Sequence, residues 1–479
     1  MDSLERKRSR WDQTAQDLDD LTSRINAWLA CWTRGDPQGH HQTQLETIKA
    51  ILLAVATTFR SRLQGINPAS PSGQLYDDCR KLSAAVVWLE RLWEFIRVKL
   101  DQRILDPAAN AQPGNLLNGK IAALLQAADE VTWSCYRPII KNLPPGHPAA
   151  KRAVVPMTYL EPEYSPAAVQ FDRRLPPGLR LTSSDPTLAS CLQNIPLPTL
   201  RLPPWCIPAP WSLALIGHEV GHHIQHELGL VNDFTSRVGA AARAAGLLDS
   251  SACLWEAWSE EIFADACSVF SIGPAAVTAI IELEWSNETT LCQRKDVYPA
   301  PAIRIALMTQ LATQLQLDVT SLPPLEQWRE LVNRSPTLKE DWNVIDRVVD
   351  LIRQPLPGDI GCLGTLYEFD PAQFGRRGRT AAWSEALRDI GSLAPRQQTS
   401  DARHMASAAL SAWNTLVSEA DESKRRATLS ALATRTPQAI LDCAEDGRRA
   451  GPGAGADIDS NAALQIATVL LGDPPAQTR

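Results

Sequence analysis

Two histidines and a glutamate near the middle of the chain have the residue types and spacing of a metal site. The sequence there reads His218-Glu219-Val-Gly-His222. If this stretch is helical, the two imidazoles lie on one face about one turn apart, where both can bind one zinc ion. Glu219 does not share that coordination but can reach a water molecule beside the metal. Pro210 and Gly229 favour a helix start before the motif and a helix end after it.

A second segment supplies the carboxylates that such a site needs. It contains Glu260, Glu261 and Asp265 on a helix expected between residues 250 and 273. Glu261 and Asp265 are four residues apart and therefore share a helix face. Glu261 can serve as the third zinc ligand, and Asp265 can accept the second ring N–H of a ligand histidine. Glu260 is the alternative ligand, and a solvated acidic helix face is the alternative explanation of the segment.

The neighbouring residues restrict the type of zinc site. A metzincin would need glycine and histidine where this chain has Gln225 and Leu228, so that class is excluded. His226 continues the metal face by a turn. Because three histidines along one straight helix span too far for one ion, we expect a supporting or structural role for it. His223 points about 100° away from the metal face and is expected to be an ordinary residue.

These motifs together resemble a known family. An HExxH motif followed some tens of residues later by ExxxD is similar to the pattern of the gluzincins, the thermolysin-like and HtpX-like metallopeptidases. The resemblance covers roughly residues 150–315. It implies a zincin-like catalytic domain that binds Zn²⁺ through His218, His222 and Glu261, with Glu219 as the general base. The membrane helices of the HtpX-like enzymes have no counterpart in this sequence.

A third segment adds to the resemblance. The stretch from Tyr298 to Ile305 is similar to the His-Pro…Arg-Ile element of HtpX-like and CAAX-prenyl-type peptidases, with Tyr298 in place of the histidine. The resemblance implies that Tyr298 or Arg304 stabilises an oxyanion, which either side chain can do by donating a hydrogen bond. The alternatives are that Tyr298 is a loop aromatic and that Arg304 is the ion-pair partner of an acidic residue.

Extended structure is expected before the metal helix. Prolines are dense between residues 138 and 210 and helical periodicity is lost there, which favours a small, irregular β part. Gluzincins pair the substrate backbone with an edge strand near this position. By that resemblance residues 199–202 are the candidate edge strand, and a plain connecting strand is the alternative.

The rest of the chain is predicted to be helical. Apolar residues recur at helical spacing in four runs within residues 1–140, separated by Gly- and Pro-containing breaks. We therefore predict a mostly α protein of the α+β class, with a zincin-like domain between N- and C-terminal helical regions. The predicted domains are an N-terminal helical bundle (1–140), a metallopeptidase domain (141–320) and a C-terminal helical region with a flexible tail (321–479).

Composition narrows the cellular setting. The chain has 479 residues, a net charge of −7 and 44% hydrophobic residues, so it has neither the basic surface of a nucleic-acid binder nor the composition of a disordered chain. Its ten cysteines form no CxxC pair, which favours a reducing compartment. No apolar stretch approaches the roughly 18 residues of a membrane span. No apolar signal region follows the charged N-terminus. A cytoplasmic protein without membrane insertion is therefore expected.

The sequence thus predicts a zinc metallopeptidase that cleaves a protein or peptide substrate. The first alternative is a latent or inactive zinc-binding scaffold that acts through its helical regions, which could also bind a partner or regulator. The second is a helical interaction protein in which the HExxH motif is accidental. An intact Glu219 argues against a degenerate enzyme, since the general base would be lost first.

Overall fold

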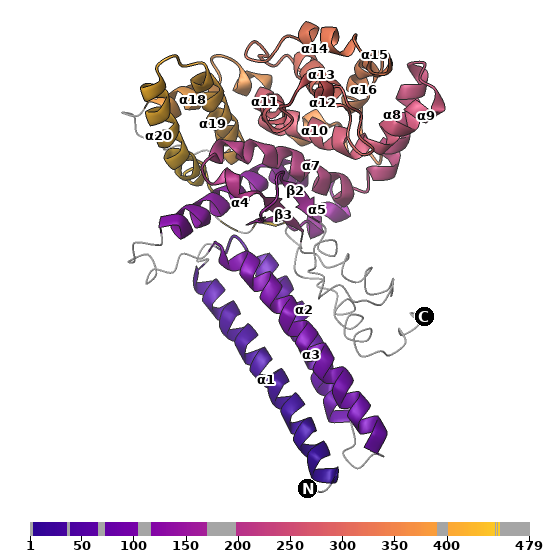
Figure 1. Ribbon diagram of the computed structural model, residues 1–479, viewed down its shortest axis with the longest axis vertical. Helices are drawn as coiled ribbons and strands as arrows, with labels where there is room; N and C mark the ends of the chain where they lie inside the picture. Colours follow the sequence, from indigo (N-terminus) through magenta and orange to yellow (C-terminus); the bar gives the residue numbers. More distant parts are fainter. Residues whose placement is uncertain are drawn as a thin grey trace. The chain divides into compact units, whose positions relative to one another are not determined.

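The chain is mostly helical with one small sheet, as the sequence predicts (Figure 1). A computed structural model describes residues 3–35, 39–65, 72–103, 116–169, 198–389, 401–445, 447 and 449–450. The tail predicted after residue 450 lies outside these ranges. Among the described residues, no helix combines the length and apolar character needed to cross a bilayer.

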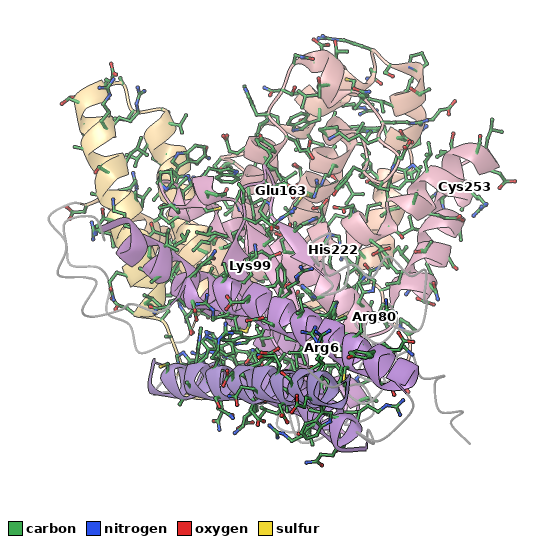
Figure 2. The ribbon with its side chains drawn as sticks, turned by 60° about the horizontal axis from the view of Figure 1, so that its bottom comes forward. Arg6, Arg80, Lys99, Glu163, His222 and Cys253 are labelled. Carbon is green, nitrogen blue, oxygen red and sulfur yellow. The ribbon has the colours of Figure 1, made fainter. Side chains whose placement is uncertain are left out.

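Three long helices form the first of two compact units. Each contains one of the apolar runs identified in the sequence, and the described side chains of those runs are buried. Trp28 and Trp32 both donate their indole N–H to Asp101, which ties α1 to the end of α3. Charged side chains such as Arg6 and Arg80 are exposed (Figure 2). The helices are α1 (Ser3–Gly35), α2 (Gln42–Gly65) and α3 (Ser72–Asp101).

The second unit contains the other described helices and the sheet, around one continuous hydrophobic core. Its first half comprises α4 (Leu116–Asn142), α5 (Pro148–Arg152), η3 (Pro204–Cys206), η4 (Pro210–Leu215), α7 (Ile216–Glu227), α8 (Val231–Ala244), α9 (Asp249–Ala257), α10 (Ser259–Ile272) and α11 (Pro274–Leu283). Its second half comprises α12 (Glu288–Leu291), α13 (Pro301–Gln314), α14 (Leu325–Val332), α15 (Pro336–Trp342), α16 (Ile345–Ile352), α17 (Leu363–Leu366), η5 (Pro371–Phe374), α18 (Arg379–Arg388), α19 (Ala402–Val417) and α20 (Glu422–Leu441).

The two units do not follow the domain boundaries predicted at residues 140 and 320. Helix α4 was assigned to the N-terminal bundle, but it packs on α7, α19 and α20 in the second unit. It also continues through Pro138 to Asn142. Buried side chains of the region after residue 320 belong to the same core as those of α7 and α10. One core therefore joins the predicted catalytic and C-terminal regions.

The strand order of the sheet corrects one expectation about the substrate strand. The strands β1 (Met157–Leu160), β2 (Ala167–Val169) and β3 (Thr199–Leu202) are arranged in the order β1-β3-β2. The strand at 199–202 is therefore central and bonded on both sides, not an edge strand. Among the described strands, β1 and β2 lie at the two edges instead. Strand order depends on which distant segments pair, and the local sequence pattern does not contain that information.

The two helices of the predicted metal site are present, with changes at their ends. The segment from Pro210 to Leu215 is a 3₁₀-helix that leads into α7, and Gly229 follows α7 in the left-handed conformation at φ 66°. The helix predicted over residues 250–273 is interrupted at Trp258, which separates α9 from α10. The indole N–H of Trp258 donates to the carbonyl oxygen of Lys295 at 2.9 Å.

Candidate metal centre

Two glycines of the metal helix allow α7 and α10 to approach closely. A Cβ atom on Gly221 would lie 2.7 Å from Cα of Ala264, and a Cβ atom on Gly217 would lie 2.7 Å from the Ile272 side chain. Real Cβ atoms do not tolerate such distances, so any other residue would force the helices apart. The two glycines flank His218 and bring its helix onto the one that carries Glu261. Their four-residue spacing, which places both on one helix face, is the signal of this close approach in the sequence.

Three side chains from these helices converge as predicted. His218 Nε2 lies 3.2 Å from His222 Nε2 and 3.2 Å from Glu261 Oε2, and His222 Nε2 lies 3.6 Å from Glu261 Oε1. One ligand atom from each residue lies within 4.8 Å of the others. Figure 2 labels His222 among the side chains of the second unit. Residues that are 39 to 43 positions apart in the sequence thus meet at one point.

The donor set fits a divalent metal ion. Two imidazole nitrogens and one carboxylate match the ligands that zinc takes in catalytic sites with an open position. Glu261 Oε2 is buried and accepts no hydrogen bond from any described residue. A buried carboxylate oxygen without a hydrogen-bond donor is costly, and a cation among the three side chains would satisfy it.

Asp265 and Arg304 support the first histidine from behind. Asp265 Oδ1 lies 2.8 Å from His218 Nδ1, the ring atom opposite the one that faces Glu261. Arg304 donates to both carboxylate oxygens of Asp265, at 2.8 and 2.9 Å. The side chains of Asp265 and Arg304 are each only 3% exposed. This arrangement fixes the His218 ring so that Nε2 points toward Glu261, and the contact of Asp265 with the other ring nitrogen is the one that the sequence predicts.

Arg304 takes the alternative role that the sequence left open for it. Besides Asp265, its guanidinium contacts Glu284 at 3.2 Å and lies 3.7 Å from Glu261. With its side chain buried and paired with acidic groups, Arg304 holds carboxylates in place and is poorly available to an oxyanion. Glu284 follows α11 and was not identified from the sequence, because its partner lies 20 residues away on another helix.

Glu219 is buried and contacts the edge strand. The backbone N–H of Ala168 in β2 donates to Glu219 Oε2 at 2.5 Å. Burial raises the pKa of Glu219, and the charge of His218 and the Ala168 N–H partly offset this effect. A raised pKa makes this carboxylate a better proton acceptor. The role of Ala168 was missed because a backbone donor leaves no mark in the sequence.

Tyr298 lies beside Arg304, in the loop before α13. The Arg304 guanidinium carbon is 5.8 Å from the centre of the Tyr298 ring. Burial, together with the charge of Glu261, raises the pKa of Tyr298 to about 12, and the Arg304 charge acts in the opposite direction. The phenol therefore keeps its proton at neutral pH and remains a hydrogen-bond donor.

The other candidates identified in the sequence lie away from the three ligands. His226 contacts Glu260 at 3.2 Å, and both side chains are close to half exposed. Neither belongs to the group of three that can hold a metal among the described residues. Glu261 rather than Glu260 is thus the carboxylate that reaches both histidines.

The charges around Asp265 keep its carboxylate ionised. Burial acts to raise the pKa of Asp265, but Arg304 and His218 outweigh it and lower the pKa to about 2. Burial opposes a charge on His218, yet its hydrogen bond to Asp265 raises the pKa of that imidazole. The pKa of His222 is lowered by burial and by the neighbouring His218 charge. Asp265 therefore remains a hydrogen-bond acceptor at all physiological pH values.

No protein-family model, curated protein or solved structure matches this chain. The resemblance to gluzincins consequently rests on the three sequence motifs.

Proposed function

We propose that this protein is a zinc-dependent endopeptidase of the gluzincin type. The observation that carries the proposal is the convergence of His218, His222 and Glu261, with a buried Glu261 oxygen that lacks a hydrogen-bond donor among the described residues. A zinc ion held by these residues would polarise the scissile carbonyl and lower the pKa of a water molecule.

The other side chains then have distinct roles. Glu219 accepts the proton of the attacking water on its carboxylate and passes it to the leaving amine. The Tyr298 hydroxyl donates a hydrogen bond to the developing oxyanion. Asp265 orients His218, and Arg304 holds Asp265, so these two are positioning residues.

One observation favours the alternative of a latent zinc protein. The Ala168 N–H already occupies one oxygen of Glu219, and it belongs to the edge strand β2. A peptide aligned along this edge would have to contact or displace β2. Activity that requires a partner or signal is therefore the second candidate function.

We also propose a cytoplasmic location. The described cysteines are all free thiols, and several are fully buried in the core. Free thiols in this number are typical of reducing compartments.

The decisive experiment combines metal analysis with peptide-library cleavage for wild type, Glu219→Gln and Glu261→Ala. We expect one zinc per wild-type chain and chelator-sensitive cleavage. Glu219→Gln is expected to keep zinc and lose turnover by at least about 100-fold, since general acid–base catalysis contributes that much. Glu261→Ala is expected to lose both the bound zinc and the turnover. Undiminished cleavage by Glu219→Gln would overturn the proposal. Stoichiometric zinc without cleavage in wild type would favour the latent alternative.

A further inference from the structure

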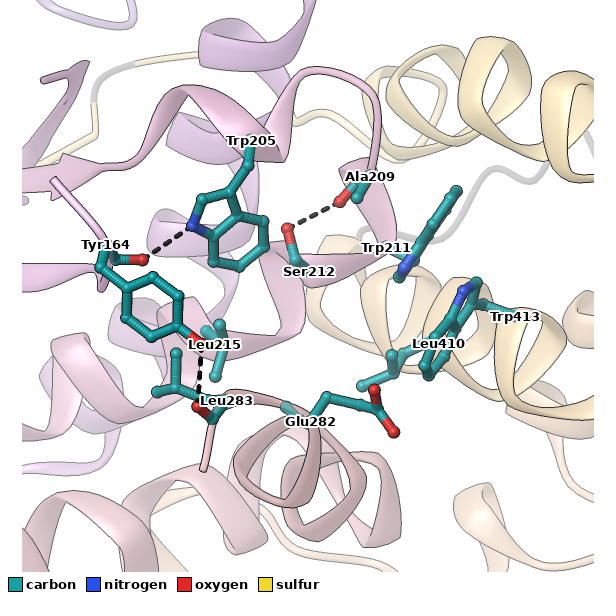
Figure 3. A pocket seen from close by; sticks show the side chains of 11 residues that line it. Tyr164, Trp205, Ala209, Trp211, Ser212, Leu215, Glu282, Leu283, Leu410 and Trp413 are labelled. Atoms are coloured by element: carbon teal, nitrogen blue, oxygen red, sulfur yellow. Dashed lines mark hydrogen bonds between the residues drawn. The ribbon is translucent and has the colours of Figure 1, made fainter. Parts of the chain in front are cut away.

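A pocket in the second unit is built from residues that take no part in the metal centre (Figure 3). Its volume is about 330 Å³, within the range of small-molecule sites. The walls come from the segment before β2 and from η3, η4, α11 and α19. Its lining is rich in aromatic side chains, among them Tyr164, Trp205, Trp211 and Trp413.

The aromatic side chains form two pairs. At one end the Trp205 indole N–H donates to the backbone oxygen of Tyr164 at 2.7 Å, and the Tyr164 hydroxyl donates to the carbonyl oxygen of Leu283 at 3.3 Å. At the other end Trp211 and Trp413 stack with ring centres 6.1 Å apart and an interplanar angle of 15°. Figure 3 shows both pairs around the pocket. The polar tips of Tyr164 and Trp205 are thus bonded to backbone, which leaves their rings as apolar and π-electron surface.

One acidic side chain lines this aromatic pocket. Glu282, at the end of α11, is solvent-exposed where it lines the pocket. Within the described part of the chain, no hydrogen bond or ion pair involves its carboxylate. A carboxylate beside aromatic ring faces gives the pocket a negative potential that attracts a cation.

We infer that this pocket binds an organic cation of the alkylammonium, guanidinium or quaternary ammonium class. The charge contacts Glu282 and the ring faces, and the alkyl part lies against the tryptophans. Tryptophan is the aromatic side chain that attracts cations most strongly. A neutral apolar ligand fits less well, because it would take water away from the Glu282 carboxylate without compensating its charge. The shared chemistry can come from a lysine or arginine side chain of a peptide or from a free quaternary amine.

Calorimetric titration of the full chain tests this inference. The probes are N-acetyl-lysine methylamide, its neutral counterpart N-acetyl-norleucine methylamide, and tetramethylammonium. EDTA-treated protein is used, so the result does not depend on the metal centre or on peptidase activity. We expect both cations to bind, and the lysine probe to bind at least about fivefold more tightly than the norleucine probe. The ratio of the two cation affinities distinguishes a peptide side chain from a free quaternary amine.

Matched variants localise the binding. Glu282→Gln is expected to weaken cation binding by about fivefold or more, and Trp413→Leu to weaken it by a similar factor. Glu326→Gln, which removes an exposed glutamate on α14, serves as the control and is expected to bind like wild type. Circular dichroism verifies that each variant is folded. Equal affinity for the lysine and norleucine probes, or a folded Glu282→Gln variant that binds normally, contradicts the inference.

Discussion

Arg304 and Asp265 form a two-point ion pair behind the proposed metal ligands, with nitrogen–oxygen distances of 2.8 and 2.9 Å. The pair joins α13 to α10. Asp265 also contacts His218, so a fixed Asp265 carboxylate fixes the orientation of the His218 ring. Both side chains are almost completely buried, so neither charge is compensated by water. The geometry of the proposed metal centre is thus linked to a buried charge pair of the second unit.

The first prediction concerns this pair. Arg304→Met leaves the Asp265 carboxylate buried and without its main partner, so we expect the free energy of unfolding to fall by about 3–5 kcal/mol. In a double-mutant cycle with Asp265→Asn, the second substitution should cost much less than the first. Urea denaturation of EDTA-treated protein measures the unfolding free energy of wild type, of each single variant and of the double variant. Strictly additive effects would show that the two side chains act independently.

The second prediction concerns the contact between α7 and α10. Gly221→Ala places a Cβ atom against Ala264, which forces the helices apart and moves His222 away from Glu261. We expect a loss of about 1–3 kcal/mol in unfolding free energy and a weaker zinc affinity. Gly119→Ala in α4 is the control, because nothing lies within 4 Å of its added Cβ. That control should be neutral or slightly stabilising. Unchanged zinc affinity in Gly221→Ala would contradict the link between packing and metal binding.

The third prediction separates ligand from non-ligand histidines. His222→Ala removes a ligand atom and is expected to abolish stoichiometric zinc. His226→Ala only removes the contact of an exposed side chain with Glu260, and such pairs contribute at most about 1 kcal/mol. Metal analysis after dialysis compares the two variants. A zinc content that falls equally in both would mean that His226 belongs to the site.

The fourth prediction assigns the oxyanion donor. If Tyr298 donates to the oxyanion, Tyr298→Phe should lower kcat by about 100-fold or more with little change in KM or zinc content. Steady-state kinetics with a cleaved library peptide, together with metal analysis, give the three quantities. A change confined to KM would indicate that Tyr298 contacts the substrate outside the reacting group.

The fifth prediction concerns pH and lies away from the metal centre. Asp401, just before α19, pairs with Arg379 at 2.9 Å and also faces Arg403 and His404. Burial acts to raise the pKa of Asp401, but His404 and the two arginines outweigh it, so the pKa is lowered. Because the folded-state pKa lies below the unfolded value, this stabilisation is present above the unfolded pKa and is lost as pH falls through the folded pKa.

Asp401→Asn should therefore lower the unfolding free energy by about 1–3 kcal/mol at neutral pH. The difference from wild type should shrink below about pH 4, where the unfolded aspartate becomes protonated. Urea denaturation at several pH values measures this difference in unfolding free energy between Asp401→Asn and wild type. Asp350→Asn, on an exposed side chain with only a distant partner, is the control. A difference that does not vary with pH would show that the charge of Asp401 is unimportant.

The sequence by itself determined the local features of this protein. Helical periodicity in the first 140 residues identified α1 to α4, because one face of each helix must be apolar to be buried. The same 3.6-residue period placed His218 and His222 on one face, and Glu261 and Asp265 on another. These inferences hold because they depend only on residues within one or two helical turns.

The tertiary structure decided which of these features meet. Glu260 and Glu261 are adjacent in sequence, and with α10 packed on α7 it is Glu261 that lies beside both histidines. Arg304 was assigned by resemblance to the oxyanion, but its burial between Asp265 and Glu284 makes it a positioning residue. Likewise, β3 is central rather than the expected edge strand, and α4 packs in the second unit rather than in the N-terminal bundle. Each depends on packing between segments far apart in the chain, and no local pattern of residues specifies that packing.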